Sequence, residues 1–193
     1  MIVSGGLIRG SHATPSAETI VLDYSNVAPA VRVDTPPPRV AGFEAFFDDE
    51  KFSDICMRVQ SEPEPERTVH LHRVVLAAAN ERFRAMLSHA WGDCSEGALN
   101  VDLEGRVSSD TFYTMLRYLY TGRVSSGNGD PVNWLDLLIL ADEYLDDHLK
   151  QLCEVHLKEY VDNGFVGTVL QYARRYNAEQ LAVYCAYRQF YHQ

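Results

Sequence analysis

The stretch His70–Leu87, HLHRVVLAAANERFRAML, decides how the rest of this chain can fold. It leaves a strand-like run, passes the charged pair His72 and Arg73, and enters the unbroken apolar run Val74–Ala79. It closes with a short amphipathic helix whose apolar residues are Phe83, Met86 and Leu87. Nothing in it has the arrangement of a reaction centre. The stretch therefore predicts the middle of a scaffold whose function lies on its surface.

Alternating side chains on both sides of this stretch predict a small sheet. Before it, apolar and polar residues alternate over Phe52–Gln60, a proline-broken loop follows, and Thr68–Leu71 returns as a second strand. After it, the apolar residues of 99–103 alternate with polar ones and predict a third strand. A short fourth strand is expected at the sheet edge, at Arg123–Ser125.

Helical spacing governs the rest of the chain. Ser109 or Asp110 can cap a helix that ends at Gly122. Two more helices follow, divided near Asp146, and the last residues predict a helical hairpin. The expected fold is α+β, a small three- to four-stranded sheet capped by helices and followed by a C-terminal helical hairpin.

Residues 1–38 differ in composition and predict a linker or flexible N-terminal extension. Thr19–Tyr24 (TIVLDY) is its strand-like run, and it is either a remnant of a preceding domain or an arm that pairs with a sheet edge. Three prolines at 36–38 stiffen the approach to the first domain. We expect that domain over residues 39–161 and a helical pair over 162–193.

Val40–Phe47 predicts a short helix with an aromatic face. Its apolar residues are Val40, Phe43, Phe46 and Phe47. These aromatic side chains exceed what one small core needs. Because a twofold interface is self-complementary, we expect this helix to form the contact of a homodimer.

Composition narrows the class of protein. Of the 193 residues, 46% are hydrophobic and 23% charged, which is typical of a soluble globular domain. The net charge of -10 disfavours nucleic acid as a partner. The longest apolar run is far shorter than the ~20 residues that cross a bilayer, and no signal peptide is apparent. Four cysteines without close pairing favour reduced thiols in a cytoplasmic or nuclear protein.

Three blocks of sequence resemble the BTB/POZ domain family. His72–Ala77 with Asn80 and Phe83 resembles the family signature H-[KR]-x-V-L-A-x-x-S-x-x-F. Phe52–Ile55 resembles the first core strand of the family, and Tyr118–Gly122 (YLYTG) resembles its Y-x-Y-T-G helix end. The blocks agree with the family in order and spacing over roughly 40–161. Residues 162–191 are similar to the paired helices, the 3-box or start of a BACK domain, that follow BTB domains in cullin-3 adaptors of the speckle and Kelch types.

The resemblance implies a homodimerising interaction domain with no enzyme activity and no cofactor. In ubiquitin-ligase adaptors a hydrophobic-x-Glu motif after the signature helix binds the cullin-3 N-terminal domain, and here Trp91 and Asp93 match it, with a shorter acid. The resemblance extends the cullin contact to Tyr144 and Phe165. Substrates would bind a separate domain that this chain lacks. Trp91 is interpreted as an exposed anchor, with packing back onto the signature helix as the alternative.

Asp54 and Arg73 match family positions that form a charged pair beside the dimer groove, where transcription regulators bind corepressor peptides. The structural interpretation, a pair that fixes the strand against the helix, is favoured because buried charges need a partner. Two other functions compete with the adaptor: a transcription-regulator BTB dimer that binds corepressor, and a purely structural oligomerisation module like that of potassium channels. The trailing helices weigh against both.

The histidines do not predict a metal site. His70 and His72 share one face of a strand, and Cys153 and His156 have helical ligand spacing. A structural zinc site needs four converging ligands, so structural histidines are the favoured interpretation.

Overall fold

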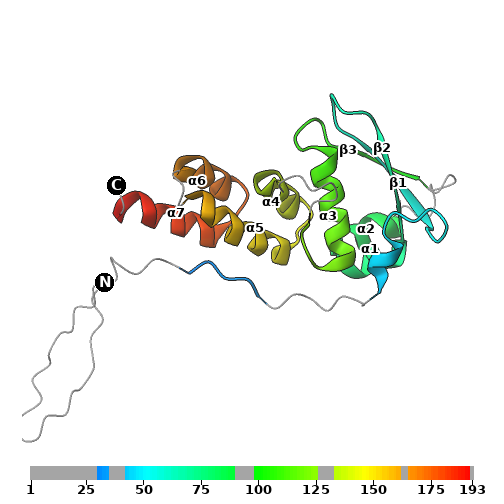
Figure 1. The fold of residues 1–193 in the computed structure, drawn as a ribbon, viewed down its shortest axis with the longest axis horizontal. Helices are drawn as coiled ribbons and strands as arrows, with labels where there is room; N and C mark the ends of the chain where they lie inside the picture. Colours follow the sequence, from blue (N-terminus) through cyan, green and yellow to red (C-terminus); the bar gives the residue numbers. More distant parts are fainter. Residues whose placement is uncertain (1–29, 35–41, 90–97, 126–132, 162–164, 192–193) are drawn as a thin grey trace, which may run out of the picture.

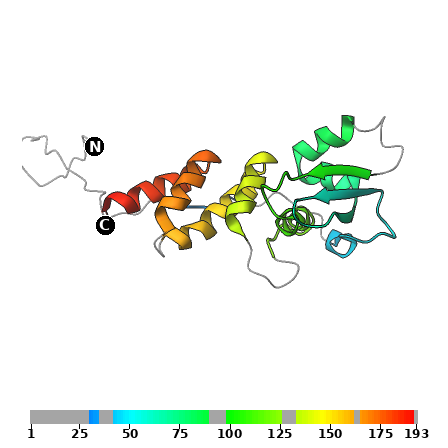
Figure 2. The same cartoon turned by 90° about the horizontal axis from the view of Figure 1, so that it is seen from above.

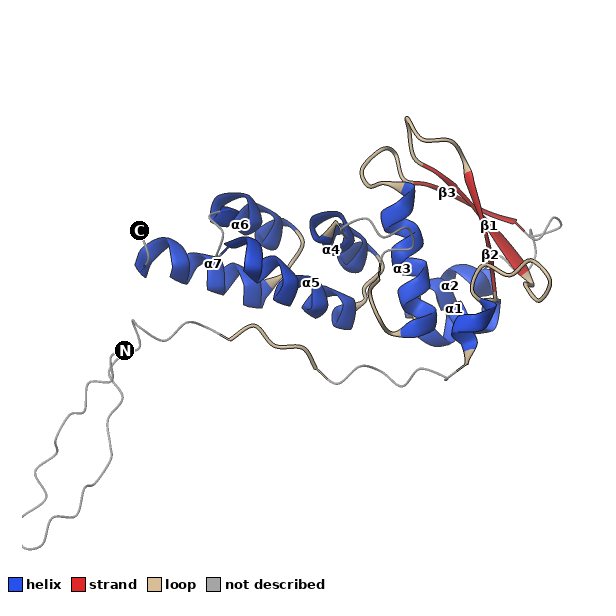
Figure 3. Ribbon diagram, viewed as in Figure 1, coloured by secondary structure: helices blue, strands red, loops and turns tan. Residues whose placement is uncertain are grey.

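A computed structural model of the chain describes residues 30–34, 42–89, 98–125, 133–161 and 165–191. The elements, in chain order, are η1 (Phe43–Phe46), β1 (Ile55–Gln60), β2 (Arg67–Leu71), α1 (Arg73–Ala79), α2 (Glu81–His89), β3 (Ala98–Asp102), α3 (Ser109–Thr121), α4 (Trp134–Glu143), α5 (Asp147–Tyr160), α6 (Val166–Arg175) and α7 (Glu179–Tyr191). The molecule is elongated, with the sheet and α1–α3 at one end and α6 and α7 at the other (Figures 1 and 2). The predicted α+β class is confirmed, with the strands confined to one end (Figure 3).

The sheet has the order β2-β1-β3. β1 pairs antiparallel with β2 and parallel with β3, so Cys56 lies between His70 and Ala98. Ile55, Met57 and Val59 are buried, as their alternation predicts. Among the described residues the sheet has three strands, because 123–125 forms no strand.

The signature stretch forms two helices that break at Asn80. This residue has extended backbone angles (φ -147°, ψ 133°), and its Oδ1 accepts a hydrogen bond from the Phe83 N–H at 3.1 Å. Asn80 thereby ends α1 and caps α2. Leu76 is fully buried but Val74 is 66% exposed, so the apolar run is only partly core.

The predicted helix at Val40–Phe47 is wrong in type and length, because the described residues form the four-residue 3-10 helix η1. Gly42 precedes it with a left-handed φ of 96°, and the Phe47 N–H donates to the Glu44 carbonyl oxygen at 3.2 Å, an i→i+3 bond. Asp48 follows with φ 59° and exchanges hydrogen bonds with the His70 backbone. These bonds tie η1 to β2.

α3 runs through the core of the end that holds the sheet. Ser108 caps it by accepting the Thr111 N–H at 3.1 Å, one residue before the predicted cap. The Ser109 N–H donates instead to the Glu64 carboxylate at 2.8 Å. Gly122 ends the helix with a left-handed φ of 69°, as predicted.

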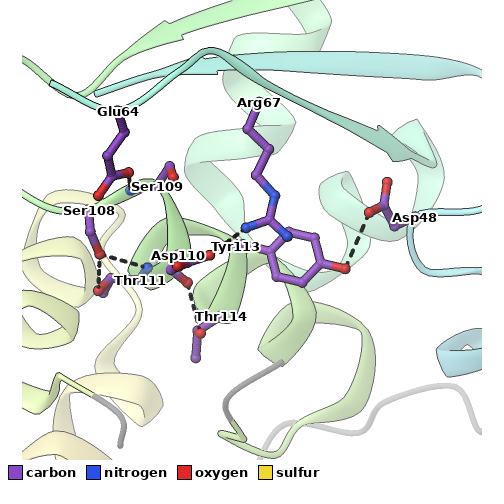
Figure 4. A network of polar contacts seen from close by, with 9 residues as sticks. All are labelled: Asp48, Glu64, Arg67, Ser108, Ser109, Asp110, Thr111, Tyr113 and Thr114. Carbon is purple, nitrogen blue, oxygen red and sulfur yellow. Dashed lines mark hydrogen bonds and ion pairs between the residues drawn. The ribbon is translucent and has the colours of Figure 1, made fainter. Parts of the chain in front are cut away.

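A second set of contacts ties the β1–β2 hairpin to α3 (Figure 4). Arg67 pairs with Asp110 at 2.6 Å and lies over the Tyr113 ring at 3.7 Å. The Tyr113 hydroxyl donates to Asp48 at 3.2 Å. Together with the bond from the Ser109 N–H to Glu64, these contacts hold the loop between β1 and β2 against the start of α3.

The four C-terminal helices form two hairpins. Asp146 divides α4 from α5 where the sequence predicts, accepting the Leu149 N–H at 2.9 Å. α6 and α7 pack on each other, and α7 also packs on α5. At that junction the buried Glu154 of α5 accepts the Leu181 N–H at 3.3 Å. The predicted C-terminal helical pair is therefore present and fixed to the rest of the molecule.

Part of the predicted N-terminal linker contacts these helices. Residues 30–34 run beside α5 and α7 (Figure 1), where Arg32 and Asp34 bind Gln180 and Gln151. The strand-like run Thr19–Tyr24 lies outside the described residues.

Candidate interaction surfaces

Exposed apolar side chains gather around η1. Phe46 is 37% exposed and Phe52 is 54% exposed, and their rings meet edge to face with centroids 5.5 Å apart. Phe46 also lies 6.3 Å from Phe43 and 6.1 Å from the His72 ring. Val74 stands two residues after His72, in the first turn of α1. We call Phe43, Phe46, Phe52 and Val74 the η1 surface.

The predicted dimer residues divide between two sides of η1. Phe47 turns inward, with its ring 4.9 Å from Tyr113 and 5.1 Å from Tyr120. Phe43 is half-buried against the core, while Phe46 is exposed. Val40 lies outside the described residues.

Sequence reasoning missed Phe52 and Val74. Phe52 lies in a turn three residues before β1, so the alternation of Ile55, Met57 and Val59 does not set its side. Val74 is two residues from the buried Leu76, which is roughly 200° around a helix and thus on the opposite side.

Asp54 and Arg73 meet as a helix cap rather than as an ion pair. The Asp54 Oδ1 accepts the backbone N–H of Arg73 at 2.8 Å, at the start of α1. The Asp54 N–H donates to the Leu71 carbonyl oxygen at 3.2 Å. Asp54 therefore joins the approach to β1 to both β2 and α1, and the Arg73 guanidinium plays no part in either bond.

The predicted cullin contacts differ in their surroundings. Trp91 and Asp93 lie outside the described residues. Phe165 stands at the start of α6 and is 59% exposed. Leu145, which was not among the predicted contacts, is 72% exposed with a left-handed φ of 54°.

The expectation that the Tyr144 side chain faces a partner is wrong. Tyr144 is only 4% exposed and stacks on Phe83 with ring centroids 4.9 Å apart. Burial raises the pKa of the phenol to about 12. α4 ends just before this residue, and the left-handed backbone of Leu145 turns the chain so that Leu145, not Tyr144, projects outward.

The rings of His72 and His156 lie against aromatic side chains. His72 Nδ1 lies 3.1 Å from the Tyr120 hydroxyl, and His156 stacks on Trp134 at 3.9 Å. In the part of the chain that the structure describes, no three His, Cys, Asp or Glu side chains are grouped to hold a metal ion. Cys56, Cys153 and Cys185 are free thiols.

No helix within the described ranges is both long enough and apolar enough to cross a bilayer. An open hollow does occur beside the β1–β2 hairpin, lined by Glu64, Pro65, Glu66, Arg67, Thr68, Ser109 and Asp110. Three of its charged residues, Glu64, Arg67 and Asp110, already take part in the contacts between the hairpin and α3.

Comparison with known proteins finds a matching family model and several relatives. A family model described as BTB/POZ domain matches residues 43–160. The inhibitor of Bruton tyrosine kinase from Xenopus laevis is 34% identical over 131 residues, covering 66% of this chain and 9% of that protein. Human Kelch-like protein 11 is 31% identical over 123 residues, covering 62% of this chain and 17% of that protein. The chain therefore spans only a small part of the length of these relatives.

Among solved structures, the BTB domain of zebrafish PATZ1 aligns with 61% of this chain and 84% of that chain. The sequence identity is 22% and the TM-score 0.44.

Proposed function

This chain belongs to the BTB/POZ domain family, and we propose that it is a homodimerising adaptor that recruits cullin-3 to a ubiquitin ligase. In this proposal the η1 surface binds the same surface of a second copy. The exposed residues of the α4–α5 turn and of α6 contact the cullin-3 N-terminal domain, together with Trp91 and Asp93. Substrates bind a domain outside this chain.

The observation that carries the dimer is the exposure of the η1 surface. Phe52 and Val74 are more than half exposed, and Phe46 lies against Phe52 rather than in the core. Clustered exposed apolar residues mark sites of protein association. A twofold dimer would cover this surface with its own copy. Lys51, whose ammonium lies 5.3 Å from the Phe52 ring, gives the surface a charged rim.

Support for the cullin contact comes from sequence and from exposure. A Kelch-like protein is among the relatives. By the sequence resemblance alone, the signature blocks and residues 162–191 are similar to those of Kelch-type adaptors. The pair α6 and α7 takes the place of the 3-box in this proposal. Leu145 and Phe165 offer large exposed apolar side chains at two helix junctions.

Light scattering after size exclusion tests the dimer. The wild-type chain is expected at twice the 21.8 kDa of one chain. Phe52→Asp with Val74→Asp should give monomers, because each buries a charge in the twofold contact. Val183→Asp, at an exposed apolar residue of α7, is the matched control and should stay dimeric. A wild-type mass near that of one chain would overturn the dimer.

Calorimetric titration with the cullin-3 N-terminal domain tests recruitment. Wild-type binding is expected, with a clear loss for Trp91→Ala and for Phe165→Ala. Leu145→Gly removes the side chain without strain, because glycine accepts a left-handed backbone, and should also weaken binding. Val183→Ala should bind like wild type. A Kd in the micromolar range gives measurable heat at protein concentrations on the order of tens of micromolar. If no heat is released at these concentrations, the adaptor proposal is overturned and the dimer is unaffected.

A further inference from the structure

Two glutamines hold residues 30–34 against the C-terminal helices. Gln180 of α7 accepts the Arg32 N–H at 2.8 Å, and its Nε2 donates to the Arg32 carbonyl oxygen at 3.2 Å. Gln151 of α5 accepts the Asp34 N–H at 2.7 Å, and its Nε2 donates to the Asp34 carboxylate at 2.7 Å. Each glutamine therefore uses both ends of its amide on one residue.

Residues 30–34 lie against α5 and α7 as an extended peptide that is bound through one of its two backbone edges. In extended backbone the polar groups of residues i and i+2 point to the same side, which places those of Arg32 and Asp34 toward the glutamines. Val31 packs against the core, and Val33 is half-buried. The two side-chain amides thus take the role that a neighbouring strand has when a peptide joins a sheet edge.

The two glutamines differ in what they select. Gln180 contacts only backbone atoms of Arg32, so it fixes the register of the peptide for any residue that has an N–H. Gln151 contacts a backbone N–H and a carboxylate, so it favours Asp at position 34. Proline at position 32 cannot donate to Gln180.

The helices that carry the glutamines are joined independently of residues 30–34. The Glu154 carboxylate of α5 accepts the Leu181 N–H of α7, one residue beyond Gln180. Leu181 and Cys185 of α7 and Leu157 of α5 are buried in the same core. The spacing of the two glutamines is therefore set before the peptide binds, which lowers the entropy cost of binding it.

From these contacts we propose that α5 and α7 form a recognition groove for an extended peptide with the pattern Val-x-x-Asp. Residues 31–34 of the chain itself are its resident ligand. A peptide with the same pattern from another molecule enters the groove when this segment leaves.

The test uses the full chain and a labelled synthetic peptide of residues 29–36, PAVRVDTP, followed by fluorescence anisotropy. Arg32→Pro with Asp34→Ala in the chain removes one backbone donor and the carboxylate of the resident ligand. This opened chain is expected to bind the peptide at least tenfold more tightly than the wild-type chain, whose groove is occupied.

Further variants of the opened chain identify the groove. Adding Gln151→Ala and Gln180→Ala should weaken peptide binding at least tenfold, whereas Gln171→Ala, an exposed glutamine of α6, should leave it unchanged. In the peptide, Asp34→Ala should weaken binding more than Asp34→Asn, because asparagine keeps an acceptor oxygen for Gln151.

Three results would overturn the proposal. One is no binding to the opened chain, and another is equal binding with and without the two glutamines. The third is equal binding to the wild-type and opened chains, which would mean that residues 31–34 do not occupy the groove.

Hydrogen exchange measured by NMR gives a second readout. The amide protons of Arg32 and Asp34 should exchange more slowly in the wild-type chain than in the variant with Gln180→Ala and Gln151→Ala.

Discussion

Asn80 donates its side-chain N–H to the Tyr144 carbonyl oxygen at 2.9 Å and so joins the break between α1 and α2 to the end of α4. Asn80 is 6% exposed, and its Oδ1 is used by the Phe83 N–H. Asn80→Ala leaves a buried carbonyl and a buried N–H without these partners. We expect a loss of about 1–3 kcal/mol in the free energy of unfolding by urea titration.

Asn80→Ser distinguishes the two bonds. The serine hydroxyl can still accept the Phe83 N–H and cap α2. The serine side chain is shorter than that of asparagine, so it does not reach the Tyr144 carbonyl oxygen. Its cost should be smaller than that of Asn80→Ala. Equal costs for the two variants would assign the whole effect to the bond with Tyr144.

Two substitutions distinguish a helix cap from an ion pair in the contact between Asp54 and Arg73. Asp54→Ala removes the acceptor of the Arg73 backbone N–H and should cost about 0.5–2 kcal/mol of unfolding free energy. Arg73→Ala keeps that N–H and should cost much less. Comparable losses from the two variants, measured by thermal and urea unfolding, would restore the ion pair predicted from the sequence.

Glu154 gives a pH dependence whose sign follows from its burial. Burial, the largest influence, raises the pKa of this carboxyl above its usual 4.5. The folded state therefore binds the proton more tightly than the unfolded state. The contribution of Glu154 to stability is full below the usual pKa and is lost as the pH rises through the raised one.

Glu154→Gln should accordingly be as stable as the wild type or more stable near pH 7, because glutamine keeps an acceptor for the Leu181 N–H without the charge. This advantage should disappear below about pH 4.5. Urea unfolding at both pH values measures it, with Glu159→Gln, at an exposed residue of α5, as the control. An advantage that grows on acidification would contradict the raised pKa.

Tyr113 of α3 makes two contacts that can be separated, one with Arg67 of the hairpin and one with Asp48, which follows η1. Tyr113→Phe keeps the ring beneath the Arg67 guanidinium but removes the hydrogen bond to Asp48. We expect it to cost about 1 kcal/mol of unfolding free energy. Tyr113→Ala loses both contacts and should cost more in the same urea titration. A cost of Tyr113→Phe equal to that of Tyr113→Ala would mean that the ring contributes nothing.

Regular elements could be predicted from the sequence because their signals are local. The alternation around Met57 places β1, and Asp146 and Gly122 mark helix ends by their own caps. The break at Asn80 could not be read in the same way, because the residue satisfies partners both in its own turn and 64 residues away.

The errors have physical reasons of the same kind. Tyr144 was expected at a surface, but the turn of the backbone occurs at Leu145, and non-glycine residues with a left-handed φ are uncommon enough that no pattern announces one. Asn177 and Gln180, close together before and within α7, bind different distant segments. Asn177 has φ 54° and donates to Asp142, while Gln180 binds the distant Arg32. Polar contacts between segments far apart in sequence leave no periodic trace.

The parallel pairing of β1 with β3 has a consequence for the order of assembly. β1 and β2 are joined by a short loop and can pair as soon as residue 71 is available, but the partner of Cys56 in β3 is Ala98. Closing that longer loop costs more chain entropy, and α1 and α2 lie within it. During synthesis on the ribosome, the hairpin and the two signature helices therefore precede the completed sheet. Until β3 arrives, one edge of β1 is left unpaired, which makes this intermediate the species most exposed to strand addition by other chains.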